Sequence, residues 1–128
     1  MTDPDFPDEL RAFIQQTIPS VDAAELLLLL AVHPDRPYQV GEVINSLRPT
    51  VISEAAARGY LQHFQSRGLV TQEANESFRY APASAELDGF VRALTRVYNE
   101  RPVTLVRIIY ASRDEKIRSF ADAFRLKK

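Results

Sequence analysis

The apolar residues between Ser53 and Gly68 recur every three or four positions, which is the spacing of one buried helix face. The residues with this spacing are Ala57, Tyr60, Leu61 and Phe64. Ser53 suits the N-cap, because its hydroxyl can accept a hydrogen bond from a free backbone amide of the first turn. Gly68 suits the C-terminal end, where the backbone turns left-handed. The pattern therefore predicts an amphipathic helix over residues 53–67.

After this helix the period of the apolar positions changes to two, which predicts a short β-hairpin. Val70 lies on the first strand, and Phe78 and Tyr80 are the inward residues of the second. Residues 74–76 are polar or small and form the expected turn. The outward residues of the second strand are then Ser77 and Arg79.

Helical spacing and capping residues also predict helices at 8–18, 21–33, 41–47, 84–99 and 112–124, and a short strand at 38–40. The segment 21–33 is apolar on nearly every face, which predicts the central helix of the core. Residues 103–110 are ambiguous, because their β-branched side chains suit a strand. Their length and the preceding Pro102 favour a helix, which we predict.

The helix at 53–67, the Arg67–Val70 corner and the hairpin resemble the recognition helix and wing of winged helix-turn-helix regulators of the MarR and PadR type. The resemblance covers residues 21–82. The expected fold class is mainly α (α+β): a winged helix-turn-helix with a small β-hairpin wing and helical N- and C-terminal extensions. We expect a single domain over 1–128, with 84–128 as the C-terminal helical extension. The resemblance implies a transcriptional regulator of bacterial type that acts on duplex DNA.

Composition argues against an enzyme. The 128 residues contain no cysteine and only two histidines, thirty positions apart, so no thiolate nucleophile or metal-ligand spacing is present. The four glycines are scattered and form no phosphate-binding loop. We therefore expect no catalytic residues, no metal and no cofactor.

The sequence also gives no indication of a membrane protein. The longest apolar run, residues 26–32, is too short to span a bilayer. The first ten residues are acidic, unlike the basic start of a signal peptide. We expect a cytoplasmic protein.

The candidate nucleic-acid interface is the outward face of the helix at 53–67. Arg58 suits bidentate hydrogen bonds to guanine, and Gln62 suits them to adenine. The candidate DNA-binding residues are Arg58, Gln62, His63, Gln65, Arg67 and Arg79. His63, Arg67 and Arg79 are the expected phosphate contacts. An ordinary solvated face has much the same composition, so this alternative stays open.

Gly59 lies in the middle of the same helix, where glycine costs about 1 kcal/mol relative to alanine. We expect it to accommodate a close approach of the helix at 41–47 or of a partner's backbone.

The charge distribution favours a different function. Residues 1–84 carry six Arg and no Lys against eleven Asp and Glu, a net charge of −5, whereas residues 85–128 carry ten basic and six acidic residues, a net charge of +4. DNA affinity comes largely from basic residues that neutralise phosphates. The alternative function is therefore a winged-helix module for protein–protein contact that does not bind DNA.

The helices after residue 84 provide more apolar surface than a core of this size needs, which suggests a homodimer. The candidate dimer-interface residues are Phe90, Leu94, Val106, Ile109, Tyr110, Ile117, Phe120 and Phe124. The alternative is that these helices pack back onto the helix at 8–18.

Overall fold

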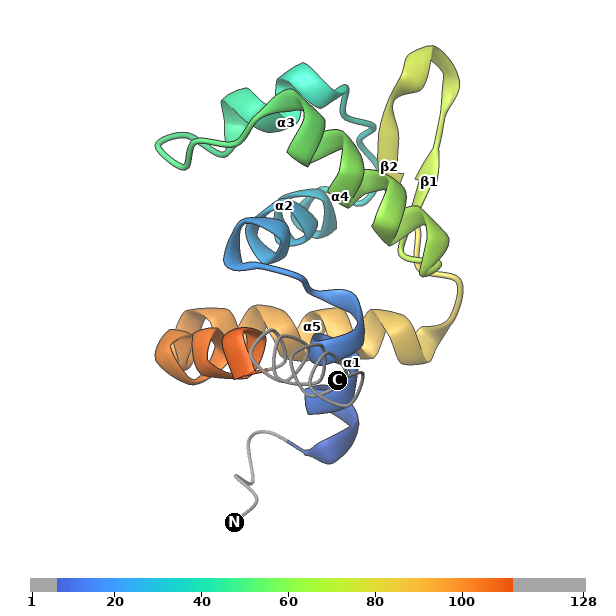
Figure 1. The fold of residues 1–128 in the computed structure, drawn as a ribbon. Helices are drawn as coiled ribbons and strands as arrows, with labels where there is room; N and C mark the ends of the chain where they lie inside the picture. The colour runs from blue at the N-terminus through green and yellow to red at the C-terminus, as the bar shows by residue number, and fades with distance from the viewer. Residues whose placement is uncertain (1–6, 112–128) are drawn as a thin grey trace, which may run out of the picture.

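The computed structural model describes residues 7–111 and has the predicted winged helix-turn-helix architecture (Figure 1). The helices and strands, in chain order, are α1 (Asp8–Thr17), α2 (Val21–Val32), α3 (Val40–Ser46), α4 (Glu54–Ser66), β1 (Val70–Gln72), the 3₁₀ turn η1 (Ala74–Glu76), β2 (Phe78–Tyr80) and α5 (Ala85–Glu100). A further helix covers residues 102–111, which confirms the helix predicted there. The helix predicted at 112–124 lies outside the described residues.

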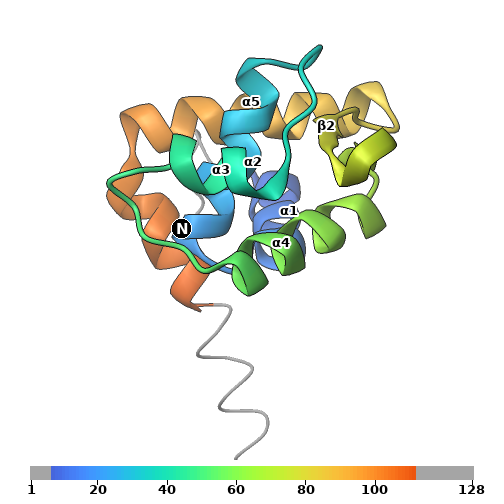
Figure 2. The ribbon, with the colours of Figure 1, turned by 90° about the horizontal axis from the view of Figure 1, so that it is seen from above.

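The elements form two layers. The winged unit, residues 21–82, lies above α1 and α5 in Figure 1. Seen from above in Figure 2, α3 and α4 lie across α2, and the hairpin is at the opposite side from the α3–α4 turn. The strands pair antiparallel, with Val70 opposite Tyr80 and Gln72 opposite Phe78.

Serine side chains begin three of the helices, as the sequence predicts. The hydroxyls of Ser20, Ser53 and Ser84 accept hydrogen bonds from the backbone N–H three residues further on, at 3.1, 3.1 and 3.2 Å. Each bond satisfies a donor that the first helical turn leaves without a partner.

Gly68 ends α4 with a φ of +77°, in the left-handed region. The Leu69 N–H donates to the Phe64 carbonyl at 2.9 Å and the Gly68 N–H to the Gln65 carbonyl at 3.1 Å. These two bonds define a Schellman motif, which turns the chain from α4 directly into β1.

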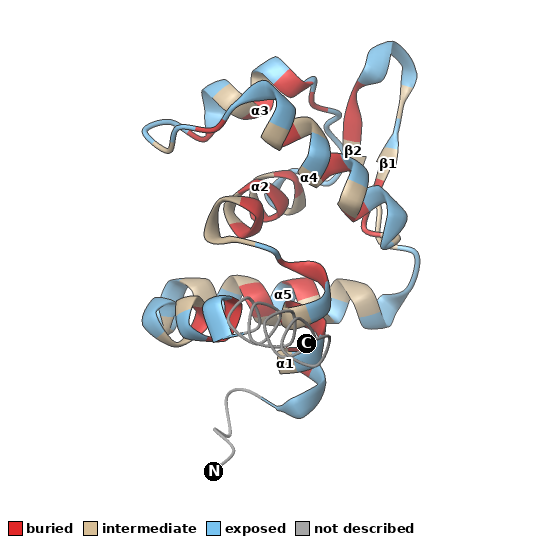
Figure 3. Cartoon of the chain, viewed as in Figure 1, coloured by how far each residue is buried: buried red, intermediate tan, exposed pale blue. Residues whose placement is uncertain are grey.

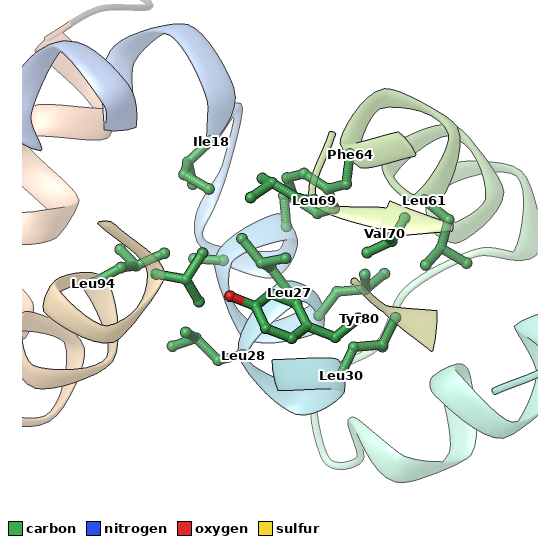
Figure 4. Close-up of a cluster of buried hydrophobic side chains, with 14 of the residues drawn as sticks. Ile18, Leu27, Leu28, Leu30, Leu61, Phe64, Leu69, Val70, Tyr80 and Leu94 are labelled. Atoms are coloured by element: carbon green, nitrogen blue, oxygen red, sulfur yellow. The ribbon is translucent and has the colours of Figure 1, made fainter. Parts of the chain in front are cut away.

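The leucine run of α2 occupies the centre of the molecule. Leu26, Leu27 and Leu30 have no exposed surface. Figure 4 shows the α2 leucines between Leu61 and Phe64 of α4 on one side and Leu94 of α5 on the other. The prediction of a central core helix is confirmed.

The strand predicted at 38–40 is wrong in extent. Only Tyr38 pairs, through two backbone hydrogen bonds of 2.8 Å with Phe78, and Val40 is already the first residue of α3. The carboxylate of Glu42 accepts the backbone N–H of Gln39 at 3.0 Å. This capping interaction begins the helix one residue earlier and leaves no room for a strand.

The outward orientation predicted for Ser77 is also wrong, because this residue is buried. Asn75 and Glu76 both have positive φ, of 62° and 58°, and bend the chain tightly. The Ser77 hydroxyl therefore lies under the turn and donates to the Ala74 carbonyl at 2.9 Å.

Candidate nucleic-acid interface

The two faces of α4 differ sharply in burial (Figure 3). Ala57, Leu61 and Phe64 are completely buried and hold the helix against the core. The opposite face is exposed and carries Glu54, Ala55, Gly59, Gln62 and Gln65. The predicted division between inward and outward residues is confirmed.

Arg58 lies at the edge of this exposed face and forms an ion pair with Glu54. Its Nη2 lies 3.2 Å from Oε1 of Glu54, one helical turn earlier, and the two side chains are 37% and 71% exposed. An ion pair this exposed adds little to stability, because water screens both charges. A ligand can therefore replace either partner at small cost.

His63 makes a structural contact that the sequence does not predict. Its Nε2 lies 2.9 Å from the backbone carbonyl oxygen of Thr17, so this nitrogen carries the proton and donates. The ring is half-buried between α4 and the α1–α2 corner. His63 thus holds α4 against the α1–α2 corner.

Two further contacts join the same flank of α4 to this corner. The Ser20 hydroxyl donates to the Tyr60 hydroxyl at 3.1 Å, and Nη2 of Arg67 donates to Oε1 of Gln16 at 3.4 Å. Arg67 remains exposed at the end of α4, and its hydrogen bond to Gln16 holds the guanidinium toward α1.

Gly59 is not needed to let α3 approach α4 closely. A Cβ atom at this position would meet nothing within 4 Å, and the residue is exposed. Of the two reasons expected for this glycine, close approach of the helix at 41–47 is therefore wrong.

The hairpin is acidic and its arginine is paired. Nε of Arg79, in β2, donates at 2.6 Å to Oε1 of Glu73, the residue that follows β1. Asn75 and Glu76 are exposed at the tip. A hollow of about 210 Å³ separates this tip from the beginnings of α3 and α4, and Glu54 and Arg58 line its other side. The wing thus places the acidic residue Glu76 across this hollow from the beginning of α4.

Two residues in the turn before α4, Arg48 and Val51, are not among the site residues predicted from the sequence. Arg48 is exposed and makes no ion pair within residues 7–111, and Val51 is 92% exposed. The available signal was their position directly before the Ser53 cap.

A chain of hydrogen bonds connects the hairpin to α5. The Tyr80 hydroxyl donates to one carboxylate oxygen of Asp88 at 2.8 Å, and Nε of Arg92 donates to the other at 2.9 Å. Burial, and then the hydrogen bond to Asp88, raise the pKa of Tyr80. A groove of about 780 Å³ opens beside these residues, between the end of α2, β2 and α5.

The structure also corrects part of the predicted dimer interface. Leu94 and Ile109 are buried within the chain, and Phe90 stacks on Phe13 of α1 with ring centroids 5.0 Å apart. Val106 is half-buried and Tyr110 is 46% exposed. Back-packing onto α1 thus covers much of this surface. The remaining candidates, Ile117, Phe120 and Phe124, lie outside the described residues.

Within residues 7–111, no group of three or more His, Asp or Glu side chains is arranged to hold a metal ion. The helices of this part of the chain are all too short or too polar to cross a membrane.

Comparison with known proteins finds similar structures but no similar sequences. No protein-family model matches the chain, and no curated protein sequence matches it. The structure is similar to the crystal structure of MepR, a transcription regulator of the Staphylococcus aureus multidrug efflux pump MepA. The TM-score is 0.51 and the identity 13%, over 93% of this chain and 87% of that one.

The structure of a MepR point mutant from a multidrug-resistant S. aureus clinical isolate matches with a TM-score of 0.48 and 13% identity, over 94% of this chain and 86% of that one. The chain thus has a MarR-like winged helix-turn-helix fold, which rests on the first of these two matches.

Proposed function

We propose that this protein is a cytoplasmic, DNA-binding transcriptional regulator that inserts the exposed face of α4 into the major groove. The proposal rests on the exposure and composition of this face of α4. It is polar, and the inner face and flank of α4 make the contacts with the rest of the molecule. In this proposal Arg58 contacts guanine and Gln62 contacts adenine, and Gln65 lies one turn further along α4.

Basic residues at both ends of α4 support this orientation. Arg48 precedes the helix and Arg67 follows it, and both are exposed. Phosphate contacts on either side of a groove fix the register of a helix between them. Arg79 can contribute a third phosphate contact once its ion pair with Glu73 is broken.

We further propose that two copies of the chain associate through the helix at 102–111. Val103 is 64% exposed and Tyr110 is 46% exposed. With half-buried Val106 they follow helical spacing on one side, and such apolar stripes commonly mark an interface. Sedimentation velocity should show a dimer that the double variant Val103→Glu, Tyr110→Glu converts to a monomer. A wild-type monomer at micromolar concentration would refute this assembly.

The second candidate function is a protein-binding adaptor. Three arginines of the winged unit are already paired with carboxylates, in the pairs Arg36–Glu42, Arg58–Glu54 and Arg79–Glu73. This pairing lowers the positive potential available to DNA and favours a partner with a basic surface.

Fluorescence anisotropy on labelled duplex DNA distinguishes the two functions. A regulator should bind the region upstream of its own gene more tightly than a random duplex of equal length. Its affinity should also fall steeply as salt rises, because binding releases counterions. Absence of binding at low salt would refute the regulator and leave the adaptor.

A further inference from the structure

The Glu54–Arg58 pair presents hydrogen-bond acceptors and donors side by side on the exposed face of α4. Oε1 of Glu54 and Nη2 of Arg58 are 3.2 Å apart, so the two charged groups reach outward together. A guanidinium offers two parallel N–H donors, and the carboxylate beside it only accepts. The pair thus presents two donors followed by an acceptor.

A G·C base pair has the complementary order of groups along its major-groove edge. Guanine offers the acceptors N7 and O6, and cytosine offers the amino donor at N4. An A·T pair instead places a donor between two acceptors and ends in a methyl group. Only the G·C edge, in one orientation, matches the side-chain order of the pair.

We propose that Glu54 and Arg58 act as one unit that recognises a single G·C base pair. Arg58 donates to guanine N7 and O6, while Glu54 accepts from the cytosine amino group. This inference rests on the proposed function, since it requires α4 in the major groove. The carboxylate then repels the acceptor of a wrong base, so its negative charge lowers general affinity and raises specificity.

The small residues beside the pair support this arrangement. A glutamate is shorter than an arginine, so it reaches a base only when the helix backbone lies close to the floor of the groove. Ala55 and Gly59 are exposed on the same face, and a Cβ at Gly59 would meet nothing within 4 Å. Gly59 thus has the role of allowing close approach to DNA, because no contact within residues 7–111 requires a glycine there.

Selection from a random duplex library, followed by sequencing, tests the inference with the full-length protein. The wild type, Glu54→Gln and Arg58→Lys are compared. Glutamine has the shape of glutamate but both donates and accepts, and lysine keeps the charge without the bidentate geometry. Both substitutions should reduce the preference for one and the same G·C pair, each by about tenfold.

Glu100→Gln is the matched control, because it removes one carboxylate from the exposed end of α5, in the other layer. It should give the wild-type consensus. Circular dichroism verifies that every variant is folded.

Three results would overturn the inference. An unchanged consensus in Glu54→Gln would show that the carboxylate contacts no base. Changes at two different base pairs in the two variants would show that they do not act as a unit. A wild type that enriches no sequence would refute sequence-specific DNA binding and with it the proposed regulator, a failure distinct from the other two.

Discussion

The inner and outer faces of α4 obey different constraints, although they belong to the same thirteen-residue helix. The inner face consists of buried apolar residues, and its flank is fixed by hydrogen bonds to the α1–α2 corner. The outer face combines an exposed ion pair, glutamines and a glycine. Packing accounts for the first set of residues. Within residues 7–111 the second set joins α4 to no other element through a hydrogen bond or ion pair, which makes it the place to look for a ligand.

The largest expected effect is on the inner face. Phe64→Ala removes a ring with no exposed surface, and the resulting cavity should lower the free energy of unfolding by about 3–5 kcal/mol. Urea denaturation followed by circular dichroism measures this change. Gln65→Ala, one residue along on the exposed side, should change stability by less than about 0.5 kcal/mol. Equal losses in the two variants would contradict the assignment of the faces.

Arg58→Ala should produce the opposite pattern on the outer face. It leaves folding nearly unchanged, because the ion pair with Glu54 is exposed. Specific DNA binding, measured by anisotropy, should weaken by about 1–3 kcal/mol as the guanine contact is lost. Arg96→Ala is the control, since it removes one exposed arginine from α5. Unchanged affinity in Arg58→Ala would exclude this residue from the interface.

His63→Ala tests the flank, where the sequence and the structure gave different expectations. Loss of the hydrogen bond to the Thr17 carbonyl should cost about 1 kcal/mol of stability, as buried or half-buried bonds of this kind do. The salt dependence of DNA binding should stay as in the wild type. A shallower salt dependence would instead support the phosphate contact that the sequence suggested.

Gly59→Ala is expected to change folding only modestly, and in the favourable direction. The position is helical and open, so alanine should raise the free energy of unfolding by up to about 1 kcal/mol. DNA affinity should fall at the same time, because the added methyl group keeps the helix from the bases. Greater stability with full affinity would show that no partner approaches this residue closely.

The features predicted well from sequence depend on neighbours in the chain. Ser20, Ser53 and Ser84 cap amides three residues away, and Gly68 closes a turn with residues just before it. The outward face of α4 follows from helical spacing alone. Its exposure could therefore be predicted together with the fold, whereas its role in binding DNA stays a prediction.

The errors involve partners that are distant in sequence or compete locally. The acceptor for His63 is the Thr17 carbonyl, forty-six residues earlier, and nothing in the local sequence marks it. Leu94 and Ile109 have the spacing of an interface, but the same spacing serves the core that buries them. Val40 has a side chain that favours a strand, but the capping interaction between Gln39 and Glu42 makes it the first residue of α3.

The bond from Tyr80 to Asp88 has a consequence for proton binding. The raised pKa of Tyr80 means that the folded chain keeps this proton at a pH where the unfolded chain, with an ordinary tyrosine pKa near 10, releases it. Below about pH 10 the two states hold the same proton and stability does not change on this account. Above it the unfolded state gains by ionisation, so alkali should loosen the junction between wing and α5. Tyr80→Phe would remove this dependence.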